Sequence, residues 1–289
     1  MEVTYTDFVF QTDSEIVQNE IKKENYLIEY NNEALEKKLC VIYFSSNNIY
    51  YPNTEENFKR KIVEQNYYEM YQTRINSAYK HIFVRDIYKQ WYIEGINSRI
   101  CTPELLLEFL QKETQGYAII TIGSSAGGYA AVLYGSLLLA KRVISFNGQF
   151  EIKSLLKTSN RQTDPLLFKY SETSLASYFD LKNFIKSNTR IYYFSSLRSK
   201  WDNQQYKYIK DIKSIKPILF KTTHHGIPFP KSALPIVINL DSNELDNLTN
   251  KIYNSLWFSI RLSGLKKTSF ELYKQAINKY NNTINKMLK

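Results

Sequence analysis

The stretch Tyr117–Gly135 reads YAIITIGSSAGGYAAVLYG and decides the fold. An apolar run typical of a strand ends in the letters GSSAG, and a run of small and apolar residues typical of a helix follows. Gly123 and Gly127 lack the Cβ atoms that would collide in a sharp turn between strand and helix. The pattern therefore predicts that Ser125 stands at this turn as a nucleophile. It also predicts that the backbone N–H of Ala126, at the positive end of the helix, can stabilise an oxyanion.

Runs of strand and helix type alternate on both sides of this stretch. Strands are expected at Val3–Phe10 and Tyr26–Tyr30 as an opening antiparallel pair, and at Leu39–Phe44, His81–Val84, Tyr117–Ile122, Arg142–Phe146, Arg190–Phe194 and Pro217–Lys221. Helices are expected at Thr102–Thr114, Ser125–Leu139, Ser242–Leu262 and Thr268–Leu288. The alternation predicts an α/β fold with a mostly parallel central sheet covered by helices on both faces.

The turn at Ser125, in this strand-to-helix context, resembles the α/β-hydrolase superfamily. The close match covers residues 117–149. The resemblance implies the α/β-hydrolase fold, in which an acid and then a histidine follow the nucleophile along the chain, each after its own strand. Residues 151–189 lie between two predicted strands and are expected to form a small helical lid insertion.

The general base is expected in the loop after the strand Pro217–Lys221, which holds two of the three histidines. A neutral imidazole there can take the proton of the serine hydroxyl. His225 is favoured, because the adjacent Gly226 permits a turn that points the ring inward. His224 is then expected to contact the substrate, although the opposite assignment stays open. His81 begins a strand and is expected to be structural.

The acid that orients the histidine is expected after the strand Arg190–Phe194. Asp202 lies there, eight residues beyond the end of the strand. Asp164 and Asp180 are weaker candidates, because they precede this strand instead of following it. A Ser125, His225 and Asp202 triad is therefore predicted.

Polar residues after other strands complete the predicted site. The resemblance implies a second oxyanion donor in the loop after Leu39–Phe44, and the backbone of Ser46 or Asn47 is expected to provide it, without the His-Gly-Gly-Gly run of ordinary lipases. Arg85, Trp91 and Gln149 follow strands whose carboxyl ends meet at the ligand-binding edge of an open α/β sheet, so contacts with the substrate are expected from them.

Length and composition set further bounds. The 289 residues, 43% of them hydrophobic, suffice for one domain over residues 1–264. Two cysteines far apart in the chain, without the spacing of metal ligands, indicate a reducing compartment and no metal site. No pattern of a signal peptide begins the sequence, so a cytoplasmic location is expected.

The formal net charge of +10 is concentrated at one end. Residues 265–289 carry six lysines and one glutamate. Apolar residues at spacings of three and four predict a basic amphipathic helix in this segment. The helix is expected to pack on the body or in an oligomer, or to contact an anionic lipid or polymer at a membrane surface. Nucleic acid is not expected as a partner, because the rest of the chain is only mildly basic.

The predicted triad indicates serine-dependent acyl transfer through an acyl-enzyme, as an esterase if water is the acceptor or as an O-acyltransferase if a sugar hydroxyl is. The compact chain is also similar to stand-alone hydrolase-fold proteins of bacterial surface-glycan assembly, which implies a carbohydrate substrate and favours an O-acetyl group. No tightly bound cofactor is expected, and acetyl-CoA or another acyl donor would be a co-substrate. The alternative is a non-catalytic glycan- or protein-binding module, in which Ser125 is inert.

Overall fold

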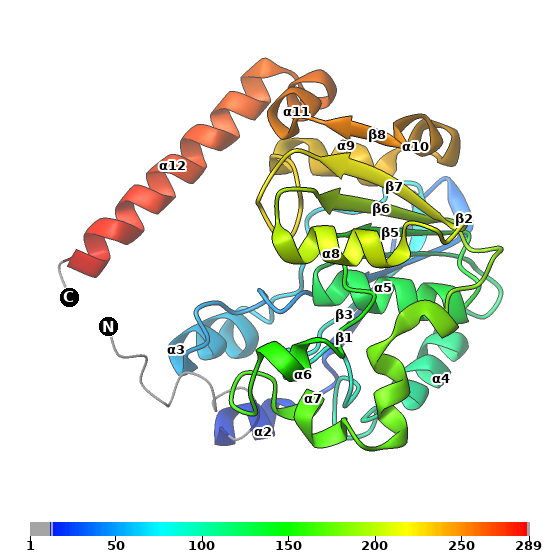
Figure 1. Ribbon diagram of the computed structural model, residues 1–289, viewed down its shortest axis with the longest axis vertical. Helices are drawn as coiled ribbons and strands as arrows, with labels where there is room; N and C mark the ends of the chain where they lie inside the picture. The colour runs from blue at the N-terminus through cyan, green and yellow to red at the C-terminus, as the bar shows by residue number, and fades with distance from the viewer. Residues whose placement is uncertain (1–11, 13, 288–289) are drawn as a thin grey trace.

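A central sheet organises the computed structural model, which describes residue 12 and residues 14–287 (Figure 1). Its strands lie in the order β1-β3-β2-β4-β5-β6-β7-β8. The pair β1 and β3 is antiparallel and all the other pairs are parallel. The bounds are β1 Tyr26–Tyr30, β2 Glu36–Phe44, β3 Ala78–Val84, β4 Ala118–Ser124, β5 Arg142–Phe146, β6 Ile191–Ser196, β7 Ile215–Phe220 and β8 Lys251–Tyr253.

Helices cover both faces of this sheet, as the alternating pattern predicts. Along β2, Ile42 and Phe44 face one apolar cluster with α4, α5 and α8, while Val41 and Tyr43 face a second cluster with α9, α10 and α11. The helix bounds are α2 Glu15–Glu20, α3 Glu55–Phe58, α4 Pro103–Thr114, α5 Ala126–Leu137, α6 Leu155–Thr158, α7 Pro165–Tyr170, α8 Lys200–Ile209, α9 Leu234–Asn239, α10 Ser242–Leu248, α11 Ser255–Ser263 and α12 Leu265–Met287. Short π- and 3₁₀-turns are η1 Lys59–Glu64, η2 Ser174–Phe179, η3 Leu181–Asn183 and η4 Lys231–Ala233.

Two of the elements expected from the sequence lie near the ends of the chain. The segment Val3–Phe10 lies outside the described residues, and β1 forms its antiparallel pair with β3. The single helix expected over Ser242–Leu262 is wrong, because the short edge strand β8 divides it and pairs with β7. Asn254 then starts α11 by accepting two backbone N–H groups of that helix with its side chain.

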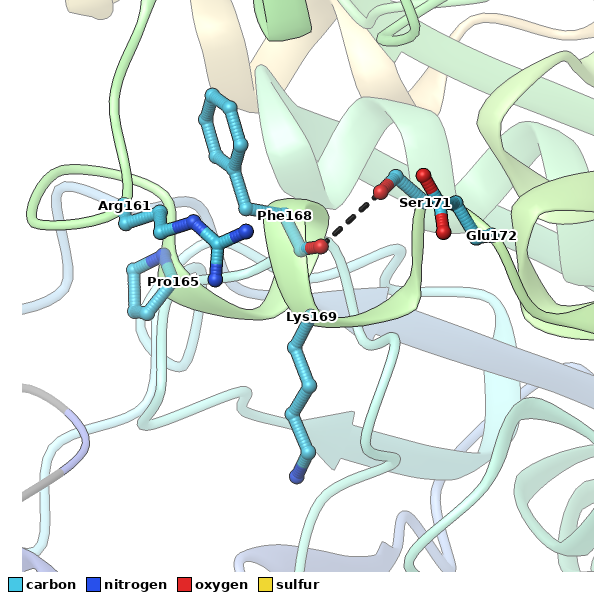
Figure 2. A pocket seen from close by; sticks show the side chains of 6 residues that line it. All are labelled: Arg161, Pro165, Phe168, Lys169, Ser171 and Glu172. Atoms are coloured by element: carbon cyan, nitrogen blue, oxygen red, sulfur yellow. Dashed lines mark hydrogen bonds between the residues drawn. The ribbon is translucent and has the colours of Figure 1, made fainter.

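The expected helical insertion is present between β5 and β6. It holds α6 and α7 and packs on the loop after β3, where the side chain of Gln90 accepts the N–H of Leu166 and Lys169 pairs with Glu94 at 2.6 Å. An open hollow lies in its surface (Figure 2). None of the predicted site residues lines this hollow, whose walls are Arg161, Pro165, Phe168, Lys169, Ser171 and Glu172.

Among the side chains that the structure describes in the basic helix α12, those near its start hold it to the body. The carboxylate of Glu271 accepts the backbone N–H groups of Lys231 and Ser232. Beyond this anchor the helix runs away from the sheet (Figure 1), and the side chains of Tyr273 and Ile277 are exposed. What this apolar side contacts stays a prediction. Among the described residues, no helix combines the length and the apolar character that crossing a membrane requires.

Candidate functional site

The turn between β4 and α5 has the strained geometry that the sequence predicts. Ser125 has φ 52° and ψ −123°, in the left-handed half of backbone space that residues with a side chain rarely adopt. A Cβ on Gly123 would lie 2.0 Å from the carbonyl oxygen of Gly127, and one on Gly127 would lie 2.2 Å from that of Phe44. Both glycines are therefore required for the close packing that holds Ser125 at the end of the sheet.

Three side chains that follow three different strands meet at this turn. The Oγ of Ser125 lies 2.8 Å from Nε2 of His225, and Nδ1 of the same ring lies 2.7 Å from Oδ1 of Asp202. The Asp202 side chain is 1% exposed and that of His225 is 38% exposed. A buried carboxylate thus holds a partly exposed imidazole against the serine hydroxyl, which is the arrangement that a nucleophilic serine requires.

Asp202 owes its place to α8, which follows β6. It stands in the first turn of that helix, whose N-cap residue Ser199 accepts the backbone N–H of Asp202 with its side chain. The two alternative acids lie elsewhere. Asp164 accepts a hydrogen bond from the hydroxyl of Ser159 within the insertion, and Asp180 accepts one from the hydroxyl of Tyr208 in α8, so neither carboxylate pairs with His225.

The loop after β7 separates the two neighbouring histidines. Gly226 has φ 98°, which supplies the turn that the sequence suggests, and the ring of His225 points to Ser125. The carbonyl oxygen of His224 accepts the hydroxyl of Ser196 at 2.6 Å, while its side chain is exposed. The ring of Trp201 stacks on His225 with centroids 5.6 Å apart. Its sequence position beside Asp202 was the only signal for this contact.

The loop after β2 differs from the expectation for the oxyanion site. The backbone N–H of Ser46 donates to Oε2 of Glu69 at 2.8 Å, and its hydroxyl donates to Oε1 at 2.8 Å. Burial raises the pKa of Glu69, and these two hydrogen bonds oppose that shift. The N–H of Ser46 is therefore already engaged, whereas Asn47 is partly exposed in the same loop. Glu69 lies 23 residues away in the sequence, where no local pattern marks it.

Two other residues of interest lie away from Ser125. Arg85 is buried, its guanidinium donates to the side chain of Asn25 and the carbonyl of Tyr67, and these bonds give it a structural environment instead of the expected substrate contact. His81 is buried in β3 with Nδ1 3.1 Å from the hydroxyl of Tyr43. Burial lowers the pKa of His81, as a histidine of the core requires.

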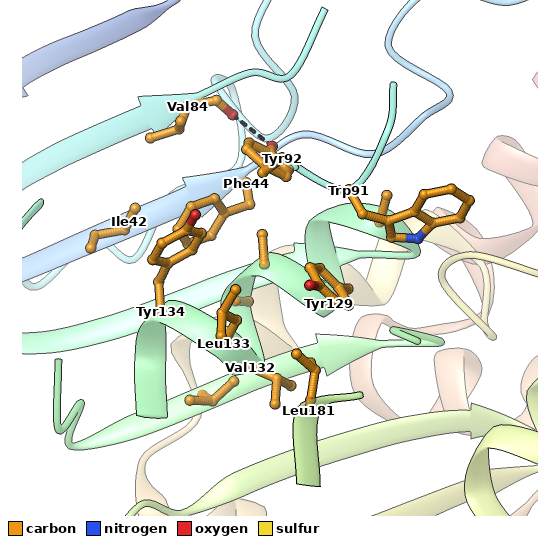
Figure 3. Packing of buried hydrophobic residues seen from close by; sticks show 14 of the residues in the cluster. Ile42, Phe44, Val84, Trp91, Tyr92, Tyr129, Val132, Leu133, Tyr134 and Leu181 are labelled. Carbon is orange, nitrogen blue, oxygen red and sulfur yellow. Dashed lines mark hydrogen bonds between the residues drawn. The ribbon is translucent and has the colours of Figure 1, made fainter. Parts of the chain in front are cut away.

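Trp91 and Gln149 form a hydrogen-bonded pair next to Ser125. The indole N–H of Trp91 donates to Oε1 of Gln149 at 3.0 Å, and Nε2 of Gln149 lies 3.5 Å from Oγ of Ser125. Both side chains are buried. Trp91 belongs to the apolar cluster around α5, and in Figure 3 it is seen above and to the right of Tyr129. The amide nitrogen of Gln149 thus approaches Oγ of Ser125, and Trp91 holds the oxygen of the same amide.

One known fold combines this strand order with a sharp turn like that at Ser125 and with helices on both faces of the sheet. Ser125 follows β4, Asp202 follows β6 and His225 follows β7, in the order that the Ser, acid and His positions have along the chain of α/β-hydrolases. The chain has the α/β-hydrolase fold. No protein-family model matches the chain, and no curated protein sequence matches it either.

Solved structures similar to this chain include enzymes of two kinds. The capsule O-acetyltransferase of Neisseria meningitidis serogroup A is 16% identical over 68% of this chain and 83% of that one, with a TM-score of 0.47. The carboxylesterase EstE1 from a metagenomic library is 13% identical over 78% and 84%, with a TM-score of 0.44. Esterase B from Lactobacillus rhamnosis is 13% identical over 92% and 91%, with a TM-score of 0.39. At these identities, the similarity assigns no role to any residue.

Proposed function

We propose that this protein is a serine acyl-transfer enzyme that works through an acyl-enzyme intermediate on Ser125. The observation that carries the proposal is the chain of two short hydrogen bonds from Ser125 through His225 to Asp202, at 2.8 and 2.7 Å. A binding module has no need for a strained serine with a base and an acid in line behind it.

The first half-reaction follows from these contacts. Asp202 accepts the Nδ1–H of His225, so Nε2 is free to take the proton of Ser125 while Oγ bonds to the carbonyl carbon of an ester or thioester. The carbonyl electron pair moves to oxygen, and the N–H of Ala126, which has no partner within its own helix, stabilises the oxyanion. When the tetrahedral intermediate collapses, the leaving alcohol or thiol takes the proton from His225. The acyl group remains on Oγ.

The second half-reaction decides the type of enzyme. Water as acceptor gives hydrolysis, and a sugar hydroxyl gives an O-acylated product. The proposed acceptor is a carbohydrate, because the ring of Trp201 stacks beside His225 and remains partly exposed, and a flat apolar ring suits a sugar face. An acetyl group carried by acetyl-CoA or another activated donor is the proposed acyl group, and the donor is a co-substrate.

The test measures the acyl group and the acceptor separately. Wild-type protein is mixed with 4-nitrophenyl acetate, with and without a panel of mono- and oligosaccharides, and products are read by mass spectrometry. O-acylated sugar formed in excess over free acetate supports transfer, and acetate alone supports an esterase. Either product must disappear with Ser125→Ala. If the wild type forms no product with this donor or with acetyl-CoA, acyl transfer of acetyl groups is ruled out.

A further inference from the structure

The side-chain amide of Gln149 has a fixed orientation beside the nucleophile. The indole nitrogen of Trp91 can only donate, so the Gln149 oxygen must face it, and the NH₂ group must face the other way. This NH₂ group lies 3.2 Å from the carbonyl oxygen of Asn147 and 3.5 Å from Oγ of Ser125. One of its two hydrogens is thus used by the backbone, and the other points to the reacting serine.

The backbone before Gln149 is pressed against the start of α5. A Cβ on Gly148 would lie 2.6 Å from the carbonyl carbon of Gly128, in the first turn of that helix. Only glycine permits this approach. The amide of Gln149 and the backbone N–H of Ala126 therefore both lie at the same helix end, next to Ser125.

The loop after β3 is built to hold Trp91 in place. Lys89, Trp91 and Tyr92 have φ of 60°, 53° and 60°, conformations that persist in residues with a side chain only where the surroundings enforce them. The carboxylate of Asp86 provides this enforcement, because it accepts the backbone N–H groups of four residues of the loop: Tyr88, Lys89, Gln90 and Tyr92. The indole is 5% exposed and so has little freedom to turn.

We propose that the Nε2–H of Gln149 is the second oxyanion donor of the site, with the N–H of Ala126 as the first, and that Trp91 is the residue that positions it. This inference rests on the proposed acyl transfer. The N–H of Ser46, which the resemblance suggests for this role, already donates to Glu69. Nε2 of Gln149 lies 3.5 Å from Oγ in the resting site, so the hydrogen bond between them is weak. The same N–H can form a stronger hydrogen bond when a charged oxygen forms beside Oγ.

The donor acts only when the bond between Oγ and the carbonyl carbon forms. The proton of Ser125 moves to His225, the carbonyl pair becomes the oxyanion, and Gln149 donates to it without any reorganisation. The amide is fully buried, so water does not compete for this hydrogen bond. A donor that strengthens only in the transition state raises kcat and leaves KM almost unchanged.

The test compares two variants of Gln149 with Trp91→Phe. Gln149→Glu keeps an acceptor for the indole and loses the N–H, and Gln149→Met removes both without adding a charge. For 4-nitrophenyl acetate we expect kcat to fall by about 10²–10³ in both variants, with KM within about threefold of wild type. Trp91→Phe leaves the amide of Gln149 in place but free to turn, so a smaller fall in kcat, about tenfold, is expected. Melting temperatures identify any variant that fails to fold.

A tetrahedral inhibitor separates an oxyanion donor from a structural residue. Affinity for a simple boronic acid, which forms a tetrahedral adduct on the serine, is expected to fall by the same factor as kcat in Gln149→Met, while affinity for the product acid stays unchanged. A folded Gln149→Met with kcat within twofold of wild type overturns the inference, as does equal loss of affinity for both ligands. Failure of the wild type itself to react at Ser125 would instead count against the proposed function.

Discussion

The hydroxyl oxygen of Ser125 lies 2.8 Å from Nε2 of His225, although 100 positions separate the two residues in the chain. The contact exists because β4 and β7 end at the same edge of one parallel sheet, so their loops face each other there. His224, the next residue in the same loop, instead uses its carbonyl group to fix the loop on Ser196. The two adjacent histidines therefore have different contacts.

Replacing each histidine tests this difference. His225→Ala removes the group that takes the serine proton, so kcat/KM for an activated acetyl ester is expected to fall by at least about 10³-fold. His224→Ala keeps the backbone carbonyl that holds the loop, and a change of less than about tenfold is expected. Steady-state kinetics on both purified variants gives the comparison. A larger loss in His224→Ala than in His225→Ala would show that the base is assigned to the wrong residue.

Asp202→Asn tests the acid at constant shape. An amide can no longer stabilise the imidazolium, and it can bind the wrong tautomer of His225, so kcat is expected to fall by about 10⁴-fold. Asp180→Asn is the matched control, because Asp180 lies in the insertion and accepts a hydrogen bond from Tyr208 of α8 instead of one from His225, and its activity is expected to stay within about twofold of wild type. Near-wild-type turnover in Asp202→Asn would remove this carboxylate from the mechanism.

Gly127→Ala tests the packing that supports the turn. Its new Cβ would meet the carbonyl oxygen of Phe44 at 2.2 Å, so β2 or α5 must move. A loss of about 2–3 kcal/mol in the free energy of unfolding and a large loss of activity are expected. Gly116→Ala serves as control, since its φ of 82° is unfavourable for alanine but no atom lies within 4 Å of the new Cβ. The free energy of unfolding of that variant is expected to fall by about 1 kcal/mol and its activity to stay unchanged. Denaturant unfolding and esterase assays measure the two quantities.

Glu69→Ala tests Ser46 against Gln149 as the second oxyanion donor. The change frees the N–H of Ser46 and breaks two hydrogen bonds to a carboxylate, so the free energy of unfolding is expected to fall by about 2–4 kcal/mol. If Gln149 is the donor, kcat does not rise. An increase of several-fold in kcat would show instead that Ser46 is the donor and that Glu69 blocks it in the resting site. Glu69→Gln, which can still accept the N–H, is the control.

The sequence alone was informative wherever chemistry forces a local pattern. The glycines around Ser125 predict the turn, because no other residue fits there, and the chain order of Asp202 and His225 follows from the sheet edge they share. Contacts between loops that are far apart in the chain could not be predicted from the sequence. The hydrogen bonds that Ser46 donates to Glu69, and those that Arg85 donates to Asn25 and Tyr67, depend on how separate loops fold onto each other, and no periodicity encodes that.

The sequence pattern also did not predict the shortest strand. The edge strand β8 has only three residues, Lys251–Tyr253, within a stretch that otherwise reads as helix. Its strand conformation comes from pairing with β7, which is a tertiary effect that overrides local propensity. Trp91 and Gln149 were expected at the substrate edge, and their strand ends do lie there. The strained loop around Asp86 holds Trp91, and the indole of Trp91 in turn orients the amide of Gln149.

The most direct test of the account is the mass of the intact protein after reaction with a fluorophosphonate. The wild type is expected to gain one adduct, to lose its esterase activity in parallel, and to carry the label on the peptide that contains Ser125. Ser125→Ala, folded by its melting curve, is expected to stay unmodified, and the neighbouring Ser124→Ala is expected to react like the wild type. An unmodified, folded wild type, or equal labelling of Ser125→Ala, would contradict the claim that Ser125 is the nucleophile.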